Sequence, residues 1–227
     1  MKRSIIITDL TRFKAGNPNV CTAGIDRETG ECIRPMPYLP FTECMRLGIL
    51  PGGILTGEFT PSKTRTAPHT EDCNYQKLTF DGPCSGEEFR KVLVGSCFAS
   101  VEKGFEVSLP AGEKVIPASH QVQQSIITLQ VAPNDIEIVE DSYKPGSIKL
   151  HFTDSSGHRH RFLPITDLGF YDYAQRYRES SALRVRLDEH RAALLAIKRG
   201  DQPWPEVNAW RLRLHQEFDA RINMVEC

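Results

Sequence analysis

The sequence predicts a mainly β protein with a smaller helical part, and three observations lead to this prediction. Short apolar stretches rich in β-branched residues form two groups, one before residue 61 and one after residue 125. Glycines and prolines separate them at short intervals, which is typical of small barrels or sandwiches and not of alternating strands and helices. From about residue 171 the apolar residues recur every three or four positions, which predicts helices.

In the first group, strands are expected at residues 5–7, 20–25, 31–34 and 54–60. Gly16, Asn17 and Pro18 favour a turn in the polar loop between the first two strands. The segment DRETG at residues 26–30 has the chemistry of a hairpin turn. A short helical turn is expected at residues 42–47.

The middle of the chain is expected to be less regular. Residues 61–90 have few alternating apolar positions, so we expect a long ordered loop, and such loops are commonly functional or disordered. At its end a short helix is expected over residues 85–94, because Ser85 is placed to cap it and acidic residues occupy its first turn. Residues 95–121 show a mixed pattern.

The second group of strands is followed by the helical pattern. Strands are expected at residues 126–131, 136–139, 147–152 and 158–163. A first helix carries Leu183, Leu187, Leu194 and Leu195 on one side and ends at Gly200. A second helix has an apolar stripe made of Val207, Trp210, Leu214, Phe218 and Ile222. We favour a helical hairpin packed on the β part over a separate partner-binding coiled coil.

Composition limits the classes of protein that the chain can belong to. Its 227 residues are 40% hydrophobic and 25% charged, which is typical of globular domains. We expect a cytoplasmic protein that does not enter a membrane, since no stretch approaches the roughly 18 apolar residues of a membrane span and no signal peptide is visible. The net charge of −1 argues against a polybasic DNA-binding protein but leaves room for a local basic face.

Several short motifs together resemble one family. They are CTAG at residues 21–24, TGECIRP at 29–35, PHTED at 68–72 and FLPITD at 162–167. In these stretches the chain resembles the dual OB-containing domain family of bacterial proteins, over about residues 1–175. Residues 176–227 depart from the family pattern, and Cys32 stands where a tryptophan or another large residue is expected.

The resemblance implies a domain arrangement and a class of ligand. It implies two OB-like small β-barrels, at residues 1–122 with a long inserted loop and at 123–175, with a helical region at 176–227 packed on them. It also implies nucleic-acid handling in bacterial DNA-modification or phage-defence systems. OB barrels bind oligonucleotides through aromatic stacking and a positive groove.

The residues that are candidates for catalysis lie close together in the long loop. His69, Glu71, Asp72 and Cys73 fall within five residues, so a histidine flanked by carboxylates could act as a general acid or base beside a cysteine nucleophile. The alternative is that the acids cap a turn and the histidine bonds locally. The spacing fits no zinc motif, so we expect no cofactor, with a zinc ion as the alternative. Most cysteines are expected to be inert.

Asp9 and Asp167 each follow a threonine directly after an apolar strand, which suggests corresponding positions in two duplicated barrels. Such a carboxylate can accept backbone hydrogen bonds from the next loop. The alternative is a base or an acceptor for a nucleobase edge, and of the two we expect Asp9 to face a ligand.

Basic residues form two candidate nucleic-acid contacts. Arg12, Lys14 and Arg34 are spaced to sit at one rim of the first barrel, where Arg34 could recognise a phosphate. In the segment HRHRF, strand alternation places both histidines on one face and both arginines, Arg159 and Arg161, on the other. Solvated surface charge is the alternative for both groups.

These observations lead to three hypotheses about function. The first is a dual-OB protein that engages DNA, with a modified base as a candidate target, together with other subunits of a modification or defence system. The second is a hydrolase or hydratase acting on a DNA base, for example converting a nitrile to an amide on 7-deazaguanine. The third is a non-catalytic scaffold subunit. The sequence contains no P-loop, dinucleotide-binding glycine pattern, GxSxG or HExxH motif, which argues against the common classes of NTPase, redox enzyme and hydrolase.

Overall fold

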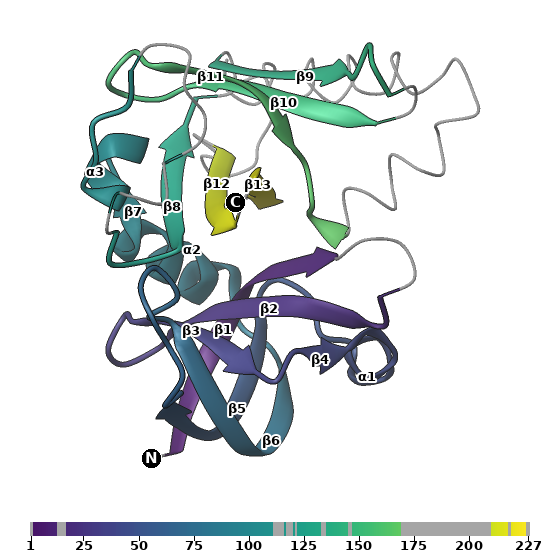
Figure 1. The fold of residues 1–227 in the computed structure, drawn as a ribbon. Helices are drawn as coiled ribbons and strands as arrows, with labels where there is room; N and C mark the ends of the chain where they lie inside the picture. Colours follow the sequence, from purple (N-terminus) through teal and green to yellow (C-terminus); the bar gives the residue numbers. More distant parts are fainter. Residues whose placement is uncertain are drawn as a thin grey trace.

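The computed structural model shows two β units, one above the other in the view of Figure 1, with β1–β6 in the lower unit and β8–β13 in the upper one. It describes residues 2–11, 17–110, 116, 120, 122–132, 135–144 and 147–168, and the backbone alone of residues 12, 210–217 and 219–225. The chain is mainly β, as the sequence predicts. Among the described residues, no helix is long and apolar enough to cross a membrane.

The lower unit is a closed five-stranded barrel. Its elements are β1 (Lys2–Arg12), β2 (Asn19–Asp26), β3 (Cys32–Met36), β4 (Leu39–Pro40), α1 (Phe41–Leu47), β5 (Gly53–Pro61) and β6 (Asp72–Pro83). The barrel strands follow the order β1-β2-β3-β6-β5 and close by pairing of β5 with β1, while β4 extends the sheet beyond β2. All barrel pairs are antiparallel except β3–β6. This strand order, with α1 between the third and fourth barrel strands, is that of an OB fold.

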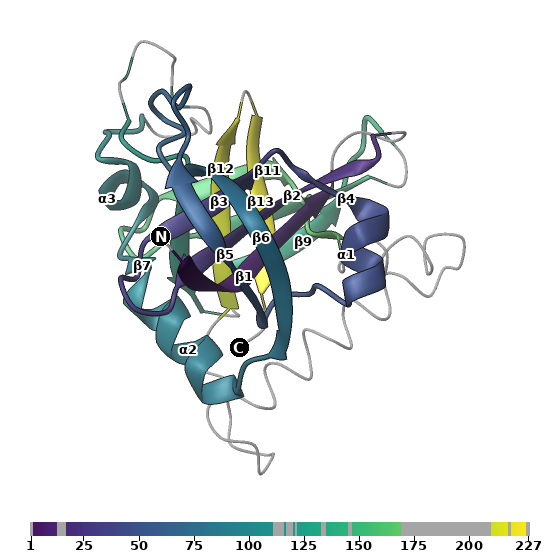
Figure 2. The ribbon, with the colours of Figure 1, turned by 90° about the horizontal axis from the view of Figure 1, so that it is seen from below.

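Alternating apolar residues fill this barrel and explain why its strands form. Ile5, Ile7, Ile33, Leu55 and Phe59 are almost completely buried in one core, and each such side chain stabilises the fold by about 1.5–3 kcal/mol. The glycine of the CTAG segment allows β2 to approach β1 closely, because a Cβ on Gly24 would lie 2.6 Å from the Ile6 carbonyl oxygen. Figure 2 shows the barrel from below, with β1, β5 and β6 crossing and α1 and α2 on opposite sides.

The prediction of a long loop over residues 61–90 is wrong at residues 72–83, which form β6. The strand contains an irregularity that disturbs the alternation on which the prediction relied. Its pairing with β5 shifts register between Thr56 and Glu58, and Lys77 has a positive φ of 51°. Tyr75 and Leu78 therefore both pack on the core although they are three residues apart.

The upper unit consists of two sheets around a second core. Its described elements are α2 (Gly86–Gly95), β7 (Cys97–Phe98), α3 (Val101–Phe105), β8 (Ile126–Val131), β9 (Ile136–Glu140), β10 (Ile148–Thr153) and β11 (Arg159–Pro164). One sheet has the order β11-β10-β9, and the other ends in β8-β7. The predicted strands and the capped helix are confirmed, with Ser85 and Glu88 forming a capping box. The short helix α3 was not predicted.

The prediction of a second helix in the C-terminal hairpin is wrong. The chain forms two antiparallel strands there, β12 (Trp210–Glu217) and β13 (Asp219–Val225), and β12 pairs with β8. The apolar residues at 210, 212 and 214 alternate with arginines, so the segment has a strand period as well as a helical one. Pairing along β8 favours the strand, because it satisfies the backbone groups of both partners. The first predicted helix lies outside the described residues.

Candidate nucleic-acid interface

Glu71 joins the two units. It is the last residue before β6, is only 5% exposed, and accepts three hydrogen bonds from the segment that begins β8. The donors are the Ser125 backbone N–H at 2.6 Å, the Ser125 hydroxyl at 3.0 Å and the Ile126 N–H at 3.0 Å. A general base needs a lone pair that faces its substrate, whereas both oxygens of this carboxylate are engaged by the protein.

Asp72 and Arg34 form a buried ion pair across the parallel strands β6 and β3. The Arg34 Nε donates to Asp72 at 2.6 Å, and Arg34 is 2% exposed. Burial alone would lower the pKa of Arg34, but the hydrogen bond and charge of Asp72 raise it above its ordinary value. Arg34 therefore lies inside the barrel wall and not at the solvent-facing rim where a phosphate contact was expected.

Cys73 is buried, whereas His69 is only partly buried. Cys73 is buried in the first core, and burial raises the pKa of its thiol, which opposes formation of a nucleophilic thiolate. The Nδ1 of His69 is buried without a hydrogen-bond partner among the described residues. The structure thus engages Glu71 and Asp72 in separate structural contacts. Within the described part of the chain, no cluster of three or more candidate ligands is arranged to hold a metal.

Asp9 is fully buried on β1, where the Thr8 hydroxyl donates to it at 2.7 Å. It lies opposite Ala23 at an irregularity in the β1–β2 pairing. The second threonine–aspartate pair lies nearby in the fold, because Asp167 forms an isolated bridge with Thr11. Asp9 and Asp72 do not lie on neighbouring strands. The side chain of Arg12 and the whole of Lys14 lie outside the described residues.

Strand β11 has its arginines and His160 on opposite faces, as the alternation predicts, and the arginines are on the exposed face. Arg159 and Arg161 are exposed, whereas His160 between them is buried and lies 3.3 Å from the Asp154 carboxylate. His160 is 3% exposed and stacks on Phe152 of the second core, with ring centroids 4.6 Å apart, so it does not line a groove. Burial also lowers its pKa.

Phe162 adds an exposed aromatic ring beside the arginines, which the sequence analysis missed. Strict alternation would bury it, but the β10–β11 pairing shifts register and Phe162 has a positive φ of 58°. It is 51% exposed and meets His151 edge to face, with ring centroids 4.6 Å apart. Burial lowers the pKa of His151, which favours a neutral ring. We call His151, Arg159, Arg161 and Phe162 the β11 face.

The charges of the β11 face are only partly balanced. Arg159 donates to Glu137 on β9 at 2.7 Å, and His151 lies 3.5 Å from the same carboxylate. Arg161 has no carboxylate within 4.0 Å among the residues that the structure describes. An exposed ring beside one paired and one unbalanced guanidinium is a surface on which a base can stack while a phosphate is held.

Comparisons with known proteins give only slight likenesses of fold. No protein-family model and no curated protein matches the chain. Among solved structures, it is similar to the Ifi202 HINa domain in complex with a 20-bp double-stranded DNA, at 8% identity and a TM-score of 0.37, covering 98% of this chain and 91% of that chain. It is also similar to a murine DNA-binding protein bound to double-stranded DNA, at 7% identity and a TM-score of 0.34, covering 100% and 95%. The OB assignment given above rests on strand order and not on these likenesses.

Proposed function

We propose that this chain is a nucleic-acid-binding OB protein that contacts DNA through the β11 face. The observation that carries the proposal is the exposed Phe162 ring beside two exposed arginines on one strand. A soluble protein gains nothing in stability by exposing half of a phenylalanine, whereas an unstacked base gains about 1–3 kcal/mol by stacking on such a ring.

The net charge of the chain favours weak binding to DNA. With a net charge of −1, the protein has no general affinity for phosphates, so binding depends on a few local contacts. Stacking tolerates any base, which favours single-stranded or locally opened DNA over intact duplex. We therefore expect weak binding with little sequence preference.

Fluorescence anisotropy with labelled single strands and duplexes tests the proposal. Phe162→Ala should weaken single-strand binding by about fivefold or more, which is the lower end of a stacking contact. Phe41→Ala is the matched control, because Phe41 is a partly exposed phenylalanine on α1 of the other unit. The proposal fails if the wild-type protein binds neither polymer at low salt, or if both variants lose affinity equally.

Two finer parts of the proposal rest on the family resemblance alone. They are a modified base as the target and a bacterial DNA-modification or defence system, with further subunits, as the setting. Strands that contain or lack 7-deazaguanine test the first part, since equal affinities would contradict it. Mass spectrometry of nucleosides from DNA incubated with the protein tests the enzyme alternative, which unchanged nucleosides would exclude.

A further inference from the structure

A cavity of about 560 Å³ lies between the two units. The first barrel contributes the β2–β3 hairpin and the loop between β5 and β6, and the upper unit contributes the end of α2, β7 and the start of β8. Ligand cavities of roughly 300–1,000 Å³ accommodate molecules of about the size of a nucleotide. In OB folds, the second and third strands and the loop between the last two strands commonly contact oligonucleotides. Here the upper unit adds a second wall to that surface, so that the two units form a half-open cavity.

The walls of the cavity mix polar and apolar side chains and include one aromatic ring. Its apolar residues come from both units and include Ile25 on β2, Ile126 on β8 and Phe98 on β7. Strand β7 is at the edge of its sheet, so one side of its backbone is not used for pairing with another described strand. Such a wall can stack a base on the ring and offer hydrogen-bonding groups to its edge.

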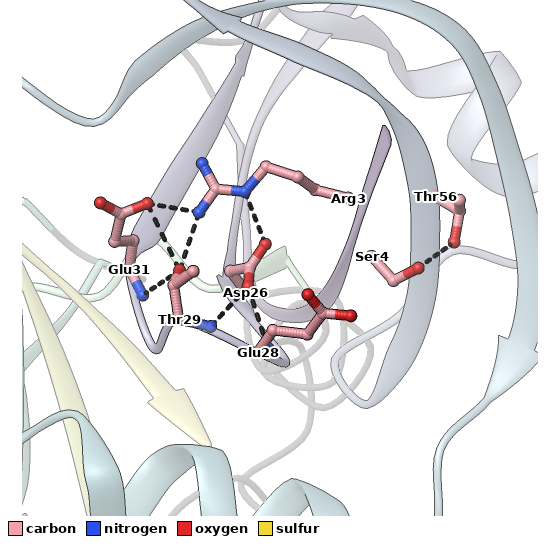
Figure 3. A network of polar contacts seen from close by, with 7 residues as sticks. All are labelled: Arg3, Ser4, Asp26, Glu28, Thr29, Glu31 and Thr56. Atoms are coloured by element: carbon pink, nitrogen blue, oxygen red, sulfur yellow. Dashed lines mark hydrogen bonds and ion pairs between the residues drawn. The ribbon is translucent and has the colours of Figure 1, made fainter. Parts of the chain in front are cut away.

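Most charges in the lining are already balanced by the protein. Figure 3 shows the Arg3 guanidinium between Asp26, Thr29 and Glu31, with its Nε 2.7 Å from Asp26. Glu71 is occupied by the start of β8, as described above. These groups hold the two sides of the cavity in place and add little net charge to it.

Arg65 is the exception in this lining. Its Nη1 donates to the Thr70 carbonyl at 3.2 Å, its side chain is exposed, and no carboxylate of the described residues lies within 4.0 Å of it. The remaining guanidinium N–H groups can therefore bind an anion at the mouth of the cavity.

We infer that this cavity binds one nucleotide, with the base against Phe98 and the phosphate at Arg65. The inference rests on the proposed function and deepens it, since it adds a pocket for a single base to a surface that tracks the strand. The same chemistry fits a free mononucleotide and an unstacked nucleotide of a strand.

Filling the cavity is the first test. Gly95 lines it, and a Cβ there would meet nothing within 4 Å and needs no left-handed backbone, so Gly95→Trp should fold and block the site. Gly86→Trp is the matched control, because Gly86 lies at the other end of α2, is not a lining residue of the cavity, and would also have no atom within 4 Å of a Cβ. Binding of a labelled single strand should weaken about tenfold in Gly95→Trp only. Equal affinities in both variants and the wild-type protein would overturn the inference.

Removing the cation is the second test. Arg65→Ala should weaken binding by about fivefold or more, whereas Lys63→Ala, an exposed lysine of the same loop outside the lining, should change it little. Calorimetry with thymidine and adenosine monophosphates separates the two sources of ligand. If the wild-type protein binds a monophosphate and Gly95→Trp does not, free nucleotides enter the cavity. If the protein binds only strands, and Gly95→Trp binds them more weakly, the cavity takes only nucleotides that belong to a strand.

Photo-crosslinking distinguishes failure of this inference from failure of the proposed function. A strand carrying a halogenated uracil should crosslink to the tryptic peptide of residues 92–103, which contains Phe98. Crosslinks confined to the peptide of residues 162–176, which begins with Phe162, would overturn the cavity site and leave the β11 face intact. If the wild-type protein binds no strand and no nucleotide, both proposals fail.

Discussion

Replacing Glu71 should separate the two units energetically, and the size of the effect follows from its contacts. In Glu71→Ala, the buried N–H groups of Ser125 and Ile126 lose their acceptor. Each unsatisfied buried group costs about 1–3 kcal/mol, so we expect the free energy of unfolding to fall by about 3 kcal/mol in total. In Glu71→Gln, one carbonyl oxygen can still accept both N–H groups, as the Oε1 of Glu71 does, and the loss should be about 1 kcal/mol.

Urea unfolding monitored by circular dichroism measures these differences by linear extrapolation. Glu28→Ala is the control, because Glu28 is an exposed glutamate of the β2–β3 turn whose backbone N–H, and not its carboxylate, makes its hydrogen bond to Asp26. The reasoning is refuted if Glu71→Ala stays within about 0.5 kcal/mol of the wild-type protein, which is the range of ordinary surface substitutions. It is also refuted if Glu71→Gln costs as much as Glu71→Ala.

Three further predictions follow from buried groups. Asp72→Asn should lower the free energy of unfolding by about 3 kcal/mol in urea titrations, because the buried guanidinium of Arg34 loses the negative charge of Asp72; a loss below about 1 kcal/mol would contradict this. Burial lowers the pKa of His160, so this residue binds a proton more readily in the unfolded chain than in the folded protein. The contribution of His160 to stability is therefore complete above pH 6.5, the ordinary pKa of histidine, and is lost as the pH falls below that value. Thermal unfolding of His160→Gln should therefore depend less steeply on pH below 6.5 than that of the wild-type protein, and parallel curves would contradict the assignment. In the folded protein, Cys73 should react with iodoacetamide much more slowly than the partly exposed Cys97, because its thiol is buried and has a raised pKa, and in urea the two should react equally fast. Peptide mass spectrometry measures both rates. Fast reaction of Cys73 in the folded protein would contradict this and would support a role as a nucleophile.

The strands that the sequence predicted well are those whose pairing is regular. The segment IITLQV at residues 126–131 is apolar and β-branched throughout, and the structure places β8 over the same residues. Strand β6 was missed because a bulge interrupts its alternation near Lys77. Residues 210–225 were assigned to a helix because their apolar residues fit the helical period as well as the strand period of two. Pairing with the distant strand β8 decides in favour of a strand.

The candidate site was harder to predict, because its contacts join residues far apart in the chain. Arg34 and Asp72 are separated by 38 residues, and Glu71 and Ser125 by 54. A single sequence shows that these residues are charged or polar but not that they are partners. The loop cluster at residues 69–73 therefore resembled a catalytic group, although its acids support the fold. The placement of Arg159 and Arg161 on the face opposite His160 needed only the local period of two, and this prediction is confirmed.

The salt dependence of DNA binding tests the central claim most directly. For single strands, the logarithm of the affinity falls with the logarithm of the salt concentration by about 0.7 for each phosphate contact. If Arg159 and Arg161 each hold a phosphate, the double variant Arg159→Ala/Arg161→Ala should reduce the slope by about 1.4. The control Arg90→Ala/Lys91→Ala removes two exposed cations from α2 and should leave the slope unchanged. Equal slopes for the wild-type protein and the β11 double variant would contradict DNA binding through the β11 face.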